Sequence, residues 1–187
     1  MRIDRVELFA IRLPLRAPFH SADGTTDVRD LGVLRLTDED GRVGLGEITP
    51  YPDPLAPPLT DLVAAFEAGA REQLTGAEVF DHGLTLENSL PGSVETAIDV
   101  ALLDLLARRE EIRVADLIGT SVQEQVAVNA TITALKPEEV SDLGERALSV
   151  GFSTVKLKVG FSDHDVHRIE ALREAVGFET LIRLDAN

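Results

Sequence analysis

The sequence of 187 residues contains no cysteine and little positive charge. Without cysteine, neither a disulfide framework nor a cysteine-based zinc site can form. Lysine and arginine together number 18 against 33 aspartate and glutamate residues, and the formal net charge is −15. Nucleic acids and anionic membrane surfaces bind basic faces, so this balance argues against both as the main partner. A small anionic substrate is compatible with it, provided that a metal or local lysines reverse the field inside a pocket.

Long hydrophobic runs are also absent. No stretch approaches the ~20 apolar residues that a membrane-spanning helix needs, and Met1–Glu7 lacks the apolar run of a signal peptide. We therefore expect a cytoplasmic protein. Only seven phenylalanines and one tyrosine are aromatic, so a core must consist mainly of Leu, Val, Ile and Ala.

The first third of the chain predicts antiparallel β-structure. Ile3–Leu13 alternates loosely, and Leu31–Thr37 and Val43–Glu47 flank an Asp-Glu-Asp-Gly turn that is typical of a hairpin. Two irregular stretches, Pro14–Arg29 and Thr49–Pro58, are longer than simple connections require. We expect both to be loops that fold over the ends of the strands and set substrate specificity.

Three helices are predicted next. Thr60 is a candidate N-cap for a helix that stops at Gly76, and Ser93 is a candidate N-cap for the strongest helix; a short helical turn spans Arg113–Ile118. The strongest helix has apolar residues at the spacing of one buried face. These residues are Val94, Ala97, Ile98, Ala101, Leu102, Leu105 and Leu106.

After about residue 125 the pattern changes to alternating strands and helices. Val126–Thr133, Thr154–Val159 and Thr180–Leu184 are predicted strands, and the helices between them end at Gly151 and Gly177. The apolar residues predicted to face inward from the second helix are Val166, Ile169, Leu172 and Val176. This order predicts parallel βαβ units, either in an open sheet or in the first part of a (β/α)₈ barrel.

Polar residues alternate with apolar ones on all three predicted strands. Because side chains alternate across a strand, Lys156 and Lys158 share one face. The polar residues on the matching faces of the other strands are Asn129, Thr131, Thr133, Arg183, Asp185 and Asn187. A Lys-x-Lys alone is more typical of a solvated strand edge, and an Asp alone of a helix cap. The same pattern on three successive strands favours a site at their C-terminal ends, where barrel enzymes have their active sites.

The residues Thr154–Gly160 (Thr-Val-Lys-Leu-Lys-Val-Gly) and Ile182–Asn187 (Ile-Arg-Leu-Asp-Ala-Asn) resemble strands two and three of the mandelate racemase and muconate lactonizing branch of the enolase superfamily. Gly44–Glu47 resembles the Gly-x-Gly-Glu of its capping domain. The resemblance implies an α/β fold class, with an α+β capping domain over residues 1–120 and the first strands of a (β/α)₈ TIM-type barrel over residues 121–187.

The resemblance also implies an activity, the metal-dependent removal of a proton next to a carboxylate with Mg²⁺ or Mn²⁺. Lys158 is then the base, Lys156 contacts the substrate carboxylate, and Asp185 is a metal ligand, since Mg²⁺ prefers hard oxygen ligands. Metal charge and the Lys156 ammonium both favour the neutral form of Lys158 that a base requires. Residues expected to bind the small carboxylate substrate are Asn129, Thr131, Asn187 and His20.

Within this branch, Leu13–Gly24 and Val126–Thr131 most resemble o-succinylbenzoate synthase, a lyase of menaquinone biosynthesis. Dipeptide epimerase, N-acylamino acid racemase and muconate cycloisomerase are alternatives on the same scaffold. A Schiff-base aldolase and a non-catalytic fragment or interaction module are alternatives from other classes. Homo-oligomerisation is also open.

The chain is short for the fold that it resembles. A full barrel takes ~250 residues, and the resemblance implies two further acidic ligands and a second lysine from later strands. We therefore expect either an incomplete chain or a barrel completed by a separate chain.

Overall fold

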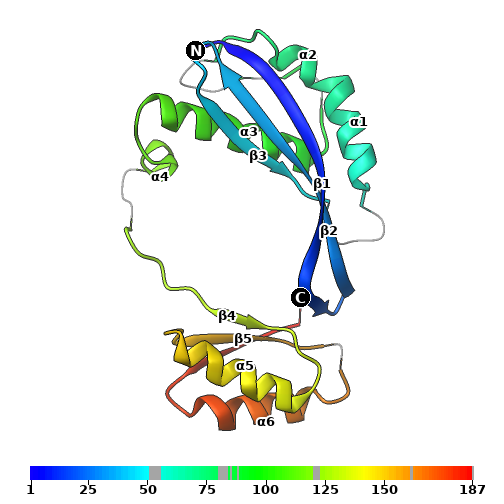
Figure 1. The fold of residues 1–187 in the computed structure, drawn as a ribbon, viewed down its shortest axis with the longest axis vertical. Helices are drawn as coiled ribbons and strands as arrows, with labels where there is room; N and C mark the ends of the chain where they lie inside the picture. The colour runs from blue at the N-terminus through cyan, green and yellow to red at the C-terminus, as the bar shows by residue number, and fades with distance from the viewer. Residues whose placement is uncertain are drawn as a thin grey trace. The chain divides into compact units, whose positions relative to one another are not determined.

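A computed structural model describes residues 1–50, 56–79, 84, 86–87, 89–119, 123–160 and 162–186. The chain forms two compact units (Figure 1). The first unit comprises Met1–Leu13 and Val28–Val122, and the second comprises Pro14–Asp27 and Gln123–Asn187. Each unit has its own hydrophobic core.

The N-terminal strands form a three-stranded sheet in the order β1-β2-β3. The strands are β1 (Ile3–Ser21), β2 (Gly24–Asp38) and β3 (Val43–Ile48). The predicted hairpin is confirmed, because β2 and β3 pair antiparallel from Thr37 opposite Val43 to Gly32 opposite Ile48.

The loop predicted over Pro14–Arg29 is wrong, because β1 and β2 continue through most of it. The prediction treated Pro14 and Pro18 as residues that interrupt a strand. Strand β1 lies at the edge of its sheet, where a proline can be accommodated because its missing N–H group need not face a partner. Arg12 and Asp30 connect the two strands, with the guanidinium donating to both carboxylate oxygens at 2.7 and 2.8 Å. The other predicted loop includes residues 51–55, which lie outside the described residues.

Four helices of the first unit follow the sheet. They are α1 (Leu59–Gly69), α2 (Arg71–Leu74), α3 (Gly92–Arg109) and α4 (Val114–Ile118). Thr60 and Ser93 lie in the first turns of α1 and α3 and are not their caps; Pro58 and Pro91 precede these helices, and neither helix has a side-chain cap. The predicted apolar face of α3 is confirmed, since all seven of its residues are buried.

Helix α3 packs directly on β3 because two glycines let the backbones meet. A Cβ atom at Gly44 would lie 2.2 Å from the carbonyl oxygen of Ala101, and one at Gly46 would lie 1.9 Å from that of Ala97. Between these glycines, the Leu45 amide donates to the Asp104 carboxylate on α3 at 3.0 Å. The Gly-x-Gly motif is therefore a packing motif of the first unit.

The second unit contains a parallel sheet in the order β4-β5-β6. Its elements are β4 (Ala130–Ile132), α5 (Pro137–Ser149), β5 (Thr154–Lys158), α6 (Asp165–Val176) and β6 (Leu181–Asp185). The predicted parallel βαβ units are confirmed, and so is the mixed fold class, an antiparallel sheet with helices followed by parallel β/α units. Strand β4 is shorter than the predicted Val126–Thr133.

The buried face of α6 differs from the prediction. Val166 is 66% exposed, whereas Arg168 is fully buried and shares a face with Leu172 and Val176 at successive intervals of four residues.

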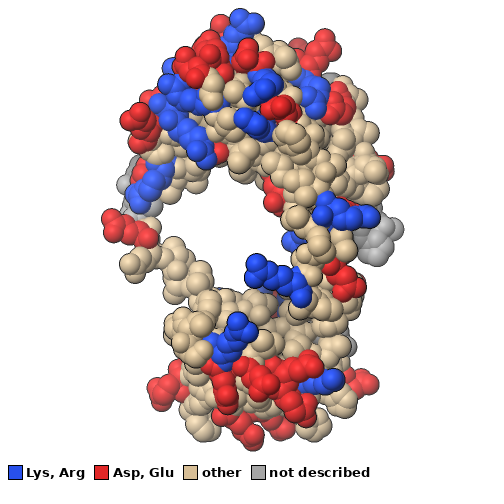
Figure 2. Space-filling model, viewed as in Figure 1, with Lys and Arg blue, Asp and Glu red and all other residues tan. Residues whose placement is uncertain are grey.

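The surface of the second unit is acidic over its helices, where Asp and Glu side chains gather on α5 and α6 (Figure 2). Such a surface repels polyanions. In the described part of the chain, no helix combines the length and apolar character that crossing a membrane requires.

Candidate functional site

The polar faces of β4, β5 and β6 meet in rows because the strands are parallel and in register. Thr131, Lys156 and Arg183 occupy one row, and Lys158 and Asp185 are paired in the next. Val155 and Leu157, which alternate with the lysines, are fully buried in the core of the second unit. The alternation of side chains therefore sends the lysines to the opposite face.

Both lysines bind the same carboxylate. The ammonium of Lys156 lies 2.5 Å from Asp185 Oδ2, and the ammonium of Lys158 lies 2.9 Å from the same atom. The side chain of Lys158 is 13% exposed, that of Lys156 is 32% exposed, and that of Asp185 is 23% exposed. Two cations on one anion leave a net positive charge, and partial burial strengthens its field. This Lys-Lys-Asp cluster is therefore suited to binding an anion such as a substrate carboxylate.

A second set of polar contacts crosses the face from β6 towards β4. Arg183 Nη1 donates to Asn129 Oδ1 at 3.4 Å, and Asn129 Nδ2 donates to Thr131 Oγ1 at 3.2 Å. Asn129 lies one residue before β4. Thr131 and Arg183 are exposed and Asn129 is half-buried, so these side chains could bind a ligand.

The other two predicted substrate-binding residues are not part of this cluster in the described structure. His20 lies in β1 close to the hairpin turn, and its Nδ1 is 2.9 Å from Thr25 Oγ1 of β2. Asn187 lies outside the described residues. Binding roles for His20 and Asn187 stay predictions.

Sequence reasoning missed Arg168, a buried cation beside the base candidate. Its Nη2 donates to the Lys158 carbonyl at 2.9 Å, and its Nε donates to the Ala134 carbonyl at 2.9 Å. The available signal was the position of Arg168 on the same helical stripe as Leu172 and Val176, together with Asp165 three residues before it. A charged residue on a buried stripe needs a partner.

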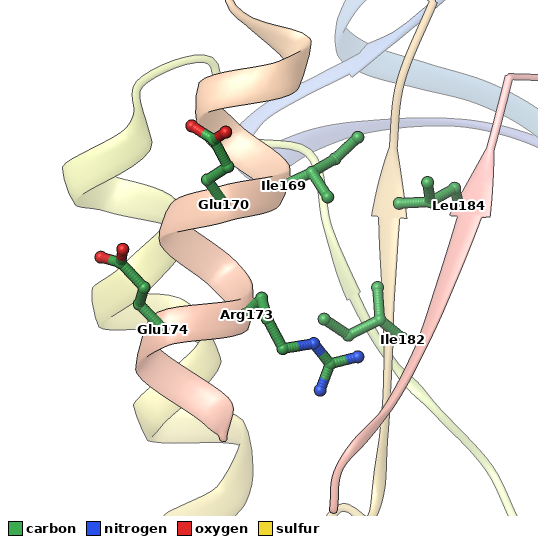
Figure 3. A pocket seen from close by; sticks show the side chains of 6 residues that line it. All are labelled: Ile169, Glu170, Arg173, Glu174, Ile182 and Leu184. Atoms are coloured by element: carbon green, nitrogen blue, oxygen red, sulfur yellow. The ribbon is translucent and has the colours of Figure 1, made fainter. Parts of the chain in front are cut away.

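The other face of the sheet carries a groove. An open groove of about 490 Å³ lies between α6 and β6, and its lining residues are Ile169, Glu170, Arg173, Glu174, Ile182 and Leu184 (Figure 3). Ile182 and Leu184 alternate with Arg183 and Asp185 along β6. The groove is thus on the opposite face from the lysines and does not contribute to the Lys-Lys-Asp cluster.

The described residues do not by themselves make a metal centre. Among residues 1–50, 56–79, 84, 86–87, 89–119, 123–160 and 162–186, no three His, Asp or Glu side chains gather where they could hold an ion. Asp185 has oxygen atoms of the type that Mg²⁺ prefers. It fits the role of one ligand, and further ligands would have to complete the site.

Comparison with known families agrees with this architecture. The family described as "Mandelate racemase / muconate lactonizing enzyme, N-terminal domain" matches residues 4–119. Among curated proteins, the chain is 29% identical over 192 residues to the hydrophobic dipeptide epimerase of Enterococcus faecalis, with 100% of this chain and 54% of that protein covered. It is 29% identical over 194 residues to the L-Ala-D/L-Glu epimerase of Bacillus subtilis, covering 100% and 53%, and 28% identical over 194 residues to the N-succinyl-L-Arg/Lys racemase of Bacillus cereus, covering 100% and 52%.

Solved structures give the same relationship. The E. faecalis dipeptide epimerase, in complex with Mg and the dipeptide L-Leu-L-Tyr, superposes with a TM-score of 0.87 at 28% identity, with 100% of this chain and 54% of that one covered. The substrate-liganded B. subtilis epimerase superposes with a TM-score of 0.88 at 28% identity and the same coverage. The chain spans about half the length of the relatives that it matches.

These relatives correct the predicted reaction class. They are epimerases and racemases, which are isomerases, so the expectation of a lyase is wrong. The names of these relatives do not support o-succinylbenzoate synthase or menaquinone biosynthesis. The physical reason is that both reaction classes begin by removing the proton next to a carboxylate. A pair of lysines beside an aspartate predicts that first step and leaves the second step open.

Proposed function

Because the chain belongs to the mandelate racemase and muconate lactonizing enzyme family of the enolase superfamily, we propose that it carries the base-bearing part of the active site of a dipeptide epimerase. The observation that carries the proposal is the pair of ammonium groups, Lys156 and Lys158, held on one carboxylate at neighbouring strand ends. The chain spans about half the length of these relatives, so the activity is proposed for the protein that carries this sequence.

Lys158 is the proposed base. In its neutral form, the Nζ atom accepts the proton from the α-carbon of one amino acid of the substrate. The C–H bond breaks, an N–H bond forms, and the electron pair moves into the adjacent carboxylate. Return of a proton to the opposite side of the carbon inverts its configuration, so a second acid on that side is required.

Lys156 and Asp185 are proposed to manage the charge that develops in this step. The Lys156 ammonium pairs with the substrate carboxylate, and Asp185 is one ligand of a divalent cation, for which Mg²⁺ is the first candidate. The cation supplies positive charge beside the carboxylate when bound. Preorganised charge of this type is generally a large part of catalysis at carbon acids.

Asn129 and Thr131 are proposed to bind polar groups of the substrate from the β4 side. The amide of Asn129 and the hydroxyl of Thr131 can donate to or accept from a peptide bond. His20 and Asn187 are proposed as further substrate contacts. An N-acylamino acid presents an amide bond in the same place as a dipeptide, so an N-acylamino acid racemase is the second candidate, favoured by the B. cereus relative.

The direct test is exchange of the substrate α-proton in deuterated water. The complete protein with Mg²⁺ is incubated with L-Ala-L-Glu, L-Leu-L-Tyr and N-succinyl-L-Lys, and loss of the α-proton signal is followed by NMR. Optical rotation reports inversion in parallel. We expect exchange and inversion with at least one dipeptide, and their loss with EDTA. A protein that is folded and loaded with metal but exchanges no α-proton on any of these compounds would refute the proposal.

A further inference from the structure

Arg168 is a fully buried cation that faces the strand ends and not the solvent. A buried guanidinium is costly unless it is paired and its N–H groups are hydrogen-bonded. Its Nη1 lies 2.5 Å from Asp165 Oδ1 in the first turn of the same helix. Two of its other nitrogens donate to the carbonyls of Ala134 and Lys158. One side chain on α6 therefore binds backbone that follows β4 and the last residue of β5.

The three residues from Lys158 to Gly160 are held at successive backbone groups. The Lys158 carbonyl accepts from Arg168, the Val159 amide donates to the Asp185 carbonyl at 2.9 Å, and the Gly160 amide donates to Asp165 Oδ2 at 2.7 Å. Asp165 thus uses one oxygen for the arginine and the other for this segment. Backbone held at adjacent peptide groups leaves the Cα of Lys158 little freedom to move.

We propose that Arg168, together with Asp165, is a positioning residue that fixes Lys158 for proton abstraction. This inference rests on the proposed function and deepens it. Arg168 reaches the backbone of Lys158 and acts through it. A base must sit within hydrogen-bond reach of the proton that it removes, and a displacement of about 1 Å can cost ~10²-fold in rate. A buried arginine is suited to this role because its planar, rigid fork can bind several acceptors at once.

Another arginine on the same helix provides a matched control. Arg173 Nη1 donates to the Thr180 carbonyl at 2.9 Å and also binds the Gly177 carbonyl. These contacts secure the segment before β6 and involve neither lysine. Arg168→Met and Arg173→Met each remove an α6 arginine that binds two backbone carbonyls, so both should lower the thermal midpoint, but only Arg168→Met should disturb Lys158.

The first experiment measures epimerisation by the complete protein at temperatures where each variant is folded. We expect Arg168→Met to lower kcat by roughly 10²-fold while KM changes little, since misplacing the base acts on the chemical step. Arg173→Met should keep kcat near the wild-type value. Arg168→Lys should restore part of the rate, because an ammonium can still bind one carbonyl. If Arg168→Met does not fold, Asp165→Asn removes the negative charge and one of the two acceptor oxygens while keeping Arg168, and it should also lower kcat.

A second measurement does not depend on activity. Reductive methylation with formaldehyde and cyanoborohydride, followed by mass spectrometry, compares Lys158 with the exposed Lys136 as an internal reference. Loosening the end of β5 should make Lys158 react several-fold faster in Arg168→Met and Asp165→Asn, and no faster in Arg173→Met.

The outcomes separate the two proposals. An inactive wild-type protein would overturn the proposed function, while the labelling comparison would still decide the role of Arg168. Equal kcat in folded Arg168→Met and Arg173→Met, with equal labelling of Lys158, would show that Arg168 only stabilises the fold and would overturn the positioning role.

Discussion

Replacing Gly46 with alanine tests how the first unit is packed. The added Cβ would lie 1.9 Å from the carbonyl oxygen of Ala97, 2.8 Å from its carbonyl carbon and 3.2 Å from its Cα. Real Cβ atoms essentially never come closer than 3.0 Å, so β3 and α3 must move apart by roughly 1 Å. The obstacle is helix backbone, which cannot rotate away as a flexible side chain can. Overpacking of this kind costs about 3 kcal/mol, the upper part of the usual range.

For a protein of this length, that cost corresponds to a fall in the thermal midpoint of roughly 6–12 °C. Thermal unfolding followed by circular dichroism measures it directly. Gly92→Ala, at the start of α3, is the matched control, since an added Cβ there meets no atom within 4 Å. That variant should be neutral or slightly more stable. If Gly46→Ala melted within about 1 °C of the wild-type protein, well below the shift that a 1 kcal/mol loss produces, the direct packing of α3 on β3 would be refuted.

Three further predictions concern single side chains. Lys158→Ala in the complete protein should lower kcat by several powers of ten, and Lys158→Arg should not restore it because a guanidinium does not deprotonate. Steady-state kinetics measure both variants, and near wild-type turnover by Lys158→Ala would reject Lys158 as the base. Asp185→Asn should weaken Mg²⁺ binding measured by calorimetry, with partial recovery of activity at high metal, and unchanged affinity would remove Asp185 from the ligands. The hydrogen bond from Arg71 lowers the pKa of Glu67. At pH values above the ordinary carboxyl pKa, Glu67→Gln should therefore lower the free energy of unfolding, by less than ~1 kcal/mol for this exposed pair. Urea unfolding should show that this difference between variant and wild type disappears as the pH falls through the lowered pKa.

The elements that were predictable from sequence are those with a strong local pattern. The seven-residue apolar stripe of α3 has the period of a helix, and the alternation around Lys156 and Lys158 has the period of a strand, so each element is visible in the sequence. The β1–β2 hairpin was not predictable in the same way, because its prolines are breakers in a central strand and are tolerated at an edge. Whether a strand is central or at an edge depends on pairing along the whole sheet, which no local window contains.

The candidate site also has a part that local sequence patterns predict and a part that they do not. Which side chains share a face follows from the period of a strand, and which of them meet across strands follows from register; both were accessible once the sheet was known to be parallel. The role of Arg168 was not predictable, because two of its partners are backbone carbonyls 34 and 10 residues earlier in the chain, and backbone groups are not visible in sequence patterns. The sequence could show only a charged residue on a buried stripe.

The choice between lyase and epimerase marks a different limit, one of chemistry. Removal of a proton beside a carboxylate needs a base and nearby positive charge, and the roles proposed for Lys156, Lys158 and Asp185 would meet that need in either reaction. The two reactions diverge afterwards, when the substrate either expels a leaving group or receives a proton on the opposite side. The first outcome depends on the substrate and the second on an acid facing the lysines, so neither can be judged from the polar face of β4, β5 and β6. Overall similarity to the epimerases therefore supports a choice that the Lys-x-Lys and Asp-Ala-Asn motifs left open.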